Sequence, residues 1–247
     1  MKEYLLFRLY GPMAAWGDIA VGEQRPSHGH PSKSAIIGLL AAALGIRRDE
    51  EEKHNKLNLD VGFAARVDAS GEILRDYHTT QVPSQTRNKV FYTRHDELAA
   101  EKLNTILSQR DYRTDACYTV ALWLNTGSAT GSLQLFERAL RKPKFVLYLG
   151  RKSCPLALPL APQIVQVETL KQAFDKLPVR EEWLQYLPEQ KQTAYFWEQI
   201  DFSASGFPSD ALHWTGSRRD SLLSRKRWQF TDREEHYLGQ PVKEKQQ

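Results

Sequence analysis

The first fifty residues alternate between apolar and polar segments in a way that predicts a buried strand followed by a buried helix. Residues 4–10 are a run of strand-forming side chains that ends at a Gly-Pro pair. A polar loop follows, and an apolar stretch then runs from Ser32 to Gly45. Serine at the start and glycine at the end are typical helix caps, and apolar residues on nearly every face indicate that this helix is buried.

Two further strand-forming segments come next, at residues 61–67 and 73–80. Turn-forming residues at 68–71 separate them, which predicts a hairpin. From residue 83 to 113 the core-forming pattern disappears. An insertion of this length between strands is typical of a protruding arm or a functional loop.

The middle of the chain adds strands at residues 117–124 and 144–149, on either side of a helix at 133–140. Leaving the arm aside, the order strand, helix, strand, strand, helix, strand is close to the β-α-β-β-α-β plan of ferredoxin-like and RNA-recognition domains.

The apolar pattern weakens after residue 155, where only a short strand and a short helix are indicated. We therefore predict an α+β protein with two parts. Residues 1–155 form a ferredoxin-like RNA-binding domain that carries the arm at about 83–113. Residues 156–247 form a small, mostly β region that packs on it.

Composition narrows the class of protein. The 247 residues contain 34 Lys and Arg against 30 Asp and Glu, so the net charge of +4 favours a polyanionic partner only where the cations are clustered. Two cysteines cannot supply a disulfide framework. No apolar run is long enough to span a membrane, and the start lacks the apolar core of a secretory signal. We expect a soluble, cytoplasmic protein without membrane contacts.

Three clusters of cations favour single-stranded RNA as the partner. They are residues 87–94, where Phe91 and Tyr92 are interleaved, residues 138–152 and residues 218–227. Phosphates are neutralised by several cations on one surface, and unpaired bases stack on exposed rings. For any one cluster taken alone, a solvated surface is the alternative.

Other chemistry has less support. Ser32-Lys33-Ser34 resembles the end of a P-loop, but the glycine that precedes the lysine in that motif is missing. An anion site at the helix start, with Lys33 and Arg25 nearby, remains open beside simple capping by a serine. His28-Gly29-His30 has the alternation of two metal ligands without a third nearby, so we predict no metal site.

Short motifs in the first 160 residues occur together in one known family. In chain order they are Gly11-Pro12-Met13-Ala14-Ala15-Trp16-Gly17, Arg25-Pro26, Pro31-Ser32-Lys33-Ser34, Gly38-Leu39-Leu40, Leu44-Gly45-Ile46, Leu74-Arg75-Asp76-Tyr77-His78-Thr79, Thr119-Val120-Ala121-Leu122-Trp123 and Tyr148-Leu149-Gly150-Arg151-Lys152-Ser153-Cys154-Pro155-Leu156. On these motifs the chain resembles the CasD family, the fifth family of CRISPR-associated proteins, whose members are subunits of type I-E Cascade surveillance complexes.

The resemblance implies a modified ferredoxin-like fold of the repeat-associated RNA-binding class, with a long β-hairpin thumb in place of the arm. It implies a non-catalytic subunit that caps the 5′ handle of the CRISPR RNA for RNA-guided DNA recognition in antiviral defence. The implied partners are that RNA, the Cascade backbone and large subunits and, through the guide, target DNA. No cofactor is implied.

Catalysis is the alternative. Relatives in type I-C systems cleave repeat RNA without a metal, which requires a base near the 2′-hydroxyl and cations on the scissile phosphate. Here the candidates for a metal-independent endoribonuclease are Tyr77, His78 and a lysine, Lys33 or Lys89.

The RNA contacts implied by the family, together with the cationic arm, give the predicted site. Its residues are Trp16, Arg25, Ser32, Lys33, Ser34, Arg87, Lys89, Tyr92, Arg94, Tyr148, Gly150, Arg151, Lys152 and Ser153. We expect Arg25, Lys33 and Arg151 to converge on one face that holds a bent, unpaired RNA end. Trp16 either stacks on a base or packs on the sheet.

Overall fold

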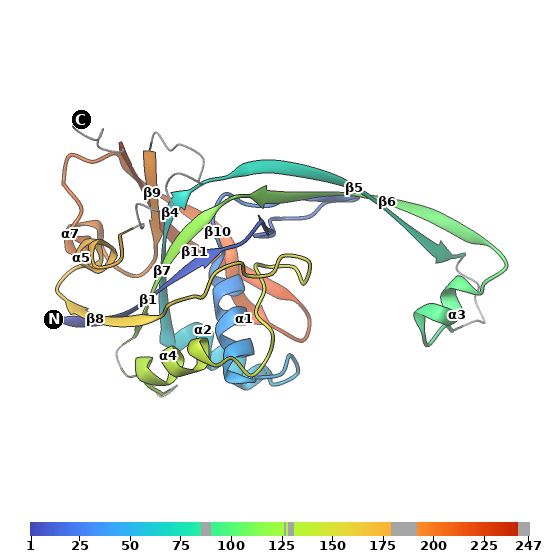
Figure 1. The fold of residues 1–247 in the computed structure, drawn as a ribbon, viewed down its shortest axis with the longest axis horizontal. Coiled ribbons are helices and arrows are strands. Elements are labelled where there is room, and N and C mark those ends of the chain that lie inside the picture. Colours follow the sequence, from blue (N-terminus) through green and yellow to red (C-terminus); the bar gives the residue numbers. More distant parts are fainter. Residues whose placement is uncertain (85–89, 126, 128–130, 179–191, 242–247) are drawn as a thin grey trace.

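An antiparallel sheet of seven strands forms the centre of the described part of the molecule, in the order β10-β11-β9-β4-β7-β1-β8 (Figure 1). The computed structural model describes residues 1–84, 90–125, 127, 131–178 and 192–241. The strands are β1 Lys2–Tyr10, β4 Val61–Ala69, β7 Cys117–Leu124, β8 Gln163–Val167, β9 Gln192–Trp197, β10 His213–Ser224 and β11 Gln229–Pro241.

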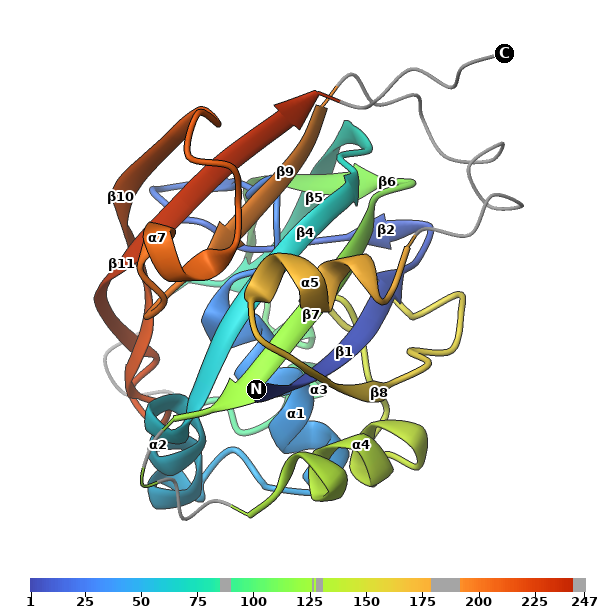
Figure 2. The same cartoon turned by 90° about the vertical axis from the view of Figure 1, so that its left-hand side faces the viewer.

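Helices cover both faces of this sheet (Figure 2). On one face lie α1 Lys33–Leu44, α2 Glu51–Asp60 and α4 Leu133–Arg141, and on the other α5 Leu170–Asp175 and α7 Phe202–Ser205. In β1, Leu5, Phe7 and Leu9 belong to the first core, whereas Tyr4 and Leu6 belong to the second. A strand with both faces buried explains why residues 4–10 do not alternate between apolar and polar side chains; Arg8 is the one charged residue among them.

The limits predicted for the first helix are confirmed. Ser32 is the N-cap and its hydroxyl accepts a hydrogen bond from the Ala35 N–H, while Gly45 ends α1 in the left-handed conformation at φ 77°. Ile36, Leu40 and other residues around the helix are buried, as the apolar pattern indicated.

The hairpin predicted between residues 61–67 and 73–80 is wrong. β4 pairs with β7 and β9, so both of its edges are occupied. After Gly71 the chain leaves the sheet as β5, Glu72–Pro83, which pairs along its whole length with β6, Leu103–Thr114. Most β5 side chains are exposed, so no apolar burial holds this strand to the central sheet.

β5 and β6 form a long arm that extends away from the body (Figure 1). The short helix α3, Arg94–Leu98, lies at its far end. At its base β6 pairs with β2, Met13–Ala14, and with β3, Gln24–Arg25. The arm therefore starts about ten residues earlier than the pattern indicated, and its base is joined to the loop that follows β1.

The strand predicted at residues 144–149 is also wrong. The backbone N–H groups of Lys144 and Phe145 donate to the carbonyls of Ala43 and Ala42 at the end of α1. Carbonyls at a helix end have no partner one turn further on, and that of Ala42 also accepts from the cap N–H of Gly45. The segment bonds to these carbonyls as a loop instead of pairing in a sheet. The place beside β1 is taken by β8.

Residues after 155 extend the same sheet at both edges. β8 adds to β1, and β9, β10 and β11 add beyond β4. The C-terminal region thus contributes strands to the central sheet, which it shares with the first part. None of the described helices is both long and apolar enough to cross a membrane.

Candidate nucleic-acid interface

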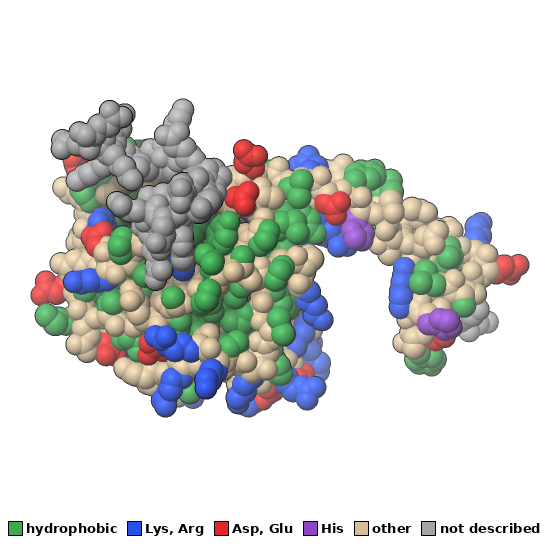
Figure 3. Space-filling view, viewed as in Figure 1, with side chains coloured by type: hydrophobic (Ala, Val, Ile, Leu, Met, Phe, Trp, Pro, Cys, Tyr) green, Lys and Arg blue, Asp and Glu red, His purple; other side chains and the backbone are tan. Residues whose placement is uncertain are grey.

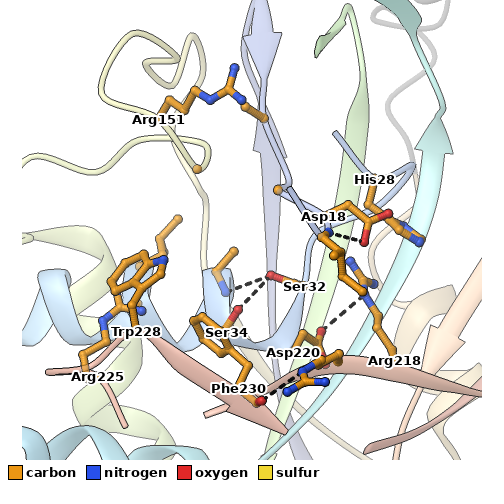
Figure 4. A pocket seen from close by; sticks show the side chains of 18 of the residues that line it. Asp18, His28, Ser32, Ser34, Arg151, Arg218, Asp220, Arg225, Trp228 and Phe230 are labelled. Atoms are coloured by element: carbon orange, nitrogen blue, oxygen red, sulfur yellow. Dashed lines mark hydrogen bonds and ion pairs between the residues drawn. The ribbon is translucent and has the colours of Figure 1, made fainter. Parts of the chain in front are cut away.

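A cavity of about 940 Å³ lies between α1, the loop after β1, the loop at residues 146–151 and the β10–β11 hairpin (Figure 4). Four arginines line it, together with the rings of Tyr148, Trp228 and Phe230. The arginines are Arg151, Arg218, Arg219 and Arg225. Three aspartates, Asp18, Asp220 and Asp232, line it as well, and Arg218 is paired with Asp220 at 3.4 Å. The remaining arginines lie beside exposed rings, which is the pattern that binds unpaired nucleic acid.

Arg151 lies on one wall and is held by three contacts. Its guanidinium lies 4.7 Å from the centre of the Tyr112 ring. It donates to the carbonyl of Arg25 at 3.2 Å and to that of Asp111 at 3.5 Å. The expected proximity of Arg25 and Arg151 is therefore present. The Arg25 side chain is exposed and donates to the carbonyls of Gly22 and Gln24.

Gly150 fixes the backbone before Arg151. Its φ is 84°, and a Cβ atom there would lie 1.9 Å from the carbonyl oxygen of Ala15. The Ala15 N–H in turn donates to the Leu149 carbonyl at 3.0 Å. Only glycine allows this close approach of two backbones. The loop at residues 146–151, which we call the glycine-arginine loop, therefore forms one rigid wall with the loop after β1.

Tyr148 lines the cavity and is 38% exposed, enough for a base or ribose to contact its ring. Lys152 and Ser153 are exposed on the loop that carries Arg151. These residues are accessible, as the predicted site required.

Ser32 and Ser34 line the cavity at the start of α1, with their hydroxyl oxygens 3.1 Å apart. The backbone N–H of Lys33 donates to the carboxylate of Asp220 at 2.8 Å. The expected anion at this helix start is therefore supplied by the protein itself, from β10.

Lys33 was predicted to face the RNA, but its side chain is buried and does not face the cavity. Its ammonium lies 2.6 Å from Glu198 Oε1, and the residue is 3% exposed. Burial raises the pKa of the Glu198 carboxyl, and Lys33 and Arg233 act in the opposite direction. A buried ammonium with a carboxylate partner has no surface left for a phosphate, so Lys33 joins α1 to the C-terminal strands.

Trp16 is also inside the protein, at 1% exposure. Its ring meets Tyr118 edge to face at 5.5 Å between centroids. Of the two roles considered for this tryptophan, packing on the sheet is the one found, because a buried ring cannot stack on a base.

The two predicted arm residues that the structure describes, Tyr92 and Arg94, lie far from the cavity (Figure 1). Tyr92 is 87% exposed near the tip, and Arg94 is paired with Glu97 at 2.7 Å. Arg87 and Lys89 fall outside the described residues. Figure 3 shows a hollow between the arm tip and the body, with Lys and Arg side chains along the side of the body that borders it.

His28 and His30 lie together, with 3.1 Å between their Nδ1 atoms, and His30 stacks on Phe196. His30 Nε2 is 3.1 Å from Glu235 Oε2, and Arg218 also contacts this histidine. Burial, with help from Arg218, lowers the pKa of His30 to about 3. The described residues hold no cluster of three metal-binding side chains, and this pair is part of a buried polar network.

The β10–β11 hairpin contributes residues that the predicted site omitted. Arg219, Arg225, Trp228 and Phe230 line the cavity opposite the glycine-arginine loop. The third basic cluster, residues 218–227, was the signal for them in the sequence. Nothing in the local pattern indicated that this hairpin folds against α1.

Comparisons with known proteins place this fold in a family. The family model described as CRISPR-associated protein (Cas_Cas5) matches residues 4–233. A protein of Escherichia coli (strain K12) named "CRISPR system Cascade subunit CasD" is 41% identical over 168 residues, which cover 65% of this chain and 70% of that protein.

Two solved structures resemble the whole fold. One, described as "CRISPR RNA-guided surveillance complex", has a TM-score of 0.63 at 23% identity and covers 97% of this chain and 90% of that one. Another, described as "Crystal structure of Cas protein", has a TM-score of 0.57 at 26% identity, with 96% and 95% covered. With the family model matching most of its length, the chain belongs to the Cas5 family of CRISPR-associated proteins.

Proposed function

We propose that this chain is a non-catalytic subunit of a type I-E Cascade complex and that it binds the 5′ handle of the CRISPR RNA in the cavity described above. The observation that carries the proposal is the Arg151 guanidinium, anchored on the Arg25 backbone carbonyl, at the wall of a cavity lined by arginines and rings. Phosphates of a bent single strand need donors at several angles, and the walls of this cavity supply them from separate loops.

The strand order supports a modified ferredoxin-like fold with a thumb. Within the central sheet the order β4-β7-β1-β8 places β7 between β1 and β4, and every neighbouring pair is antiparallel. This is a split β-α-β arrangement, with α1 connecting β1 to β4. The arm formed by β5 and β6 takes the position of the thumb insertion.

The arm is suited to contact a neighbouring backbone subunit. Ile73, Leu74, Tyr77 and Ile106 are large apolar side chains that are about half exposed along it, and Val90 and Tyr92 are exposed near its tip. Apolar side chains on a projecting hairpin favour burial against a partner. Large-subunit contacts, and contact with target DNA through the guide, complete the set of partners that we infer.

The geometry gives little support to the alternative of a metal-independent endoribonuclease. Tyr77 and His78 are exposed on the arm, where His78 lies 3.6 Å from Asp76, whereas the Lys33 ammonium is buried against Glu198. Cleavage needs a cation that is free to bind the scissile phosphate, and the buried Lys33 is not free; the other lysine considered, Lys89, lies outside the described residues.

Replacing Arg151 and Lys152 with alanine tests the proposed site. We expect weaker binding of an RNA that carries the repeat-derived 5′ end, and a salt dependence whose log–log slope falls by about 0.7 for each lost phosphate contact. Arg138→Ala with Lys142→Ala, which removes the same charge from the end of α4, is the control. Equal slopes for the two double variants would place the RNA elsewhere.

Incubation of the purified protein with full repeat RNA and EDTA tests the non-catalytic role. We expect intact RNA after prolonged incubation. Specific cleavage that persists in EDTA and disappears in His78→Ala would establish the alternative.

A further inference from the structure

A second group of positive charge lies on another wall of the cavity, at the tip of the β10–β11 hairpin. The guanidinium of Arg225 lies 4.3 Å from the centre of the Trp228 ring, and that of Arg48, from the loop after α1, lies 4.2 Å from the same ring. Arg225 and Trp228 line the cavity, away from Arg151 in Figure 4. We call these three residues the arginine–tryptophan stack.

The cations of the stack have no acidic partner in the described part of the chain. No ion pair joins Arg48 or Arg225 to a carboxylate there, and Arg225 Nε is buried without a hydrogen-bond partner. Burial lowers the pKa of Arg225 and the charge of Arg48 lowers it further, whereas Tyr148 acts in the opposite direction. Two guanidinium groups on one ring repel each other, and an anion between their N–H edges would relieve that cost.

The stack is built into the fold by its neighbours. Gly38 of α1 leaves room for Arg225, since a Cβ atom at position 38 would lie 3.1 Å from its Nη2 atom. Trp228 occupies the left-handed backbone region at φ 58°, which a residue other than glycine adopts only when its surroundings hold it there. Packing against α1 and the hairpin turn therefore determine where the two guanidinium groups lie.

We propose that the arginine–tryptophan stack binds a phosphate of the RNA backbone, as a second contact on the strand that passes Arg151. This rests on the proposed function, because Arg225 and Trp228 line the cavity of the proposed handle site and Arg48 lies behind them on the Trp228 ring. Stacked guanidinium groups keep their N–H edges free, and that fork matches two phosphate oxygens. Tyr148, which is close enough to affect the Arg225 pKa, connects the two walls along the cavity.

The first test removes the two cations as Arg48→Ala with Arg225→Ala. We expect affinity for the repeat-derived RNA to fall about tenfold, or about 1.4 kcal/mol, because the charged donors to the phosphate are lost. The log–log salt slope should fall by about 0.7 for one lost phosphate.

Lys226→Ala with Arg227→Ala is the matched control, because both residues are exposed on the same hairpin and carry the same charge. It should change affinity and slope less. A double variant of Arg48 and Arg225 that binds like this control overturns the proposal. Arg225→Lys guards against misfolding: it keeps the charge and loses the fork, and we expect it to bind more weakly than the wild type.

The second test replaces single phosphates of the RNA with neutral methylphosphonates. If the stack holds one phosphate, neutralising that phosphate weakens the wild type and has little further effect on the Arg48 and Arg225 double variant. The phosphate identified with Arg151→Ala should be a different one. Purely additive losses at every position overturn the proposal.

The outcomes separate the two ideas. Loss of RNA affinity in the Arg151 and Lys152 variant, without loss in the Arg48 and Arg225 variant, leaves the proposed function standing and rejects the stack as a phosphate site. Unchanged RNA affinity in both variants rejects both. Unchanged RNA affinity with lost binding of another Cascade protein shows that the stack binds protein carboxylates, and also overturns the proposal.

Discussion

Lys33 illustrates how burial decides what a charged residue can do. In the sequence it lies between two serines at a helix start, a position typical of phosphate binding. In the structure its ammonium is paired with Glu198, which is 165 positions later and 4% exposed. No local pattern reveals such a partner, and only the addition of the C-terminal strands to the sheet brings the carboxylate there.

Replacing Lys33 with methionine should destabilise the protein. The change leaves the Glu198 carboxylate buried with only Arg233, at 3.8 Å, to compensate it, and breaking a buried pair costs about 3 kcal/mol. Urea unfolding measures this loss. Lys152→Met, an exposed change on the cavity loop, should stay within about 0.5 kcal/mol. RNA affinity of folded Lys33→Met close to that of the wild type would agree with a structural role, whereas a large loss without destabilisation would contradict it.

His30 predicts how stability depends on pH. Burial lowers its pKa in the folded protein from 6.5 to about 3, so below pH 6.5 the unfolded chain takes up a proton that the folded one does not. The free energy of unfolding should therefore fall as the pH drops from 6.5 towards 4.5, by up to about 1.4 kcal/mol per pH unit for one group. Above pH 6.5 this histidine contributes no pH dependence.

At pH values below the ordinary pKa of a carboxyl group, Glu235 also makes the free energy of unfolding fall as the pH drops. Its contacts with His30 and the arginines outweigh burial and lower its pKa. Burial also lowers the pKa of His28, His54 and His213, so the share of His30 between pH 6.5 and 4.5 is the difference between the wild type and a His30 variant. In His30→Asn the slope over this interval should shrink, whereas His95→Asn, a change at an exposed histidine of the arm, should leave it as in the wild type. Equal slopes in the two variants would be the contrary result.

At the scale of elements, the loop at residues 146–153 depends on a single glycine. Gly150→Ala meets the Ala15 carbonyl at 1.9 Å and also places a side chain at φ 84°. Gly127 has a similar φ of 79° with open space around its Cβ position, so Gly127→Ala measures the backbone term alone, about 1–2 kcal/mol.

We expect Gly150→Ala to cost clearly more than Gly127→Ala in urea unfolding, because two backbone segments must separate. Moving the loop also moves Arg151 away from the Arg25 carbonyl, so RNA affinity should fall at Gly150→Ala and not at Gly127→Ala. If both variants lost the same stability and kept full affinity, the loop would not be the rigid wall described here.

The elements that depend on local pattern were predictable, and those that depend on distant partners were not. β1, α1, β4 and β7 follow from apolar runs and caps, because burial and capping are written in neighbouring residues. The pairing of β5 with β6 depends on which strand edges are free. β8 pairs with β1 in the place predicted for residues 144–149, because those residues bond to carbonyls at the end of α1.

The candidate site divides in the same way. Of the three cations expected on one face, Arg151 contacts the backbone carbonyl of Arg25, whereas Lys33 is buried against Glu198. Trp16 was placed correctly only as one of two options, because a loop tryptophan carries no local sign of its burial. Arg225 and Trp228 lie on a hairpin whose contact with α1 has no trace in either local sequence.

For the whole molecule, the arm and the body are expected to fold with little dependence on one another. The distal arm is exposed on most positions of β5, while its base is held where β6 pairs with β2 and β3. Segments that bury little apolar surface contribute little to global stability. If the arm contacts a neighbouring subunit as proposed, its loss should reduce assembly and leave the stability of the body nearly unchanged.

Shortening the arm tests this separation. An Asn-Gly turn that joins His78 to Ser108, which face each other in the hairpin, removes the distal half and keeps the paired base. The free energy of unfolding should change by less than about 1 kcal/mol, because the removed residues lie outside both cores. RNA affinity of the isolated chain should fall only slightly, since the cavity is intact. Incorporation into Cascade, measured by co-purification with the other subunits, should fall sharply. A shortened chain that assembles normally would show that the arm is not the contact with the neighbouring subunit, and one that unfolds would show that arm and body form one cooperative unit.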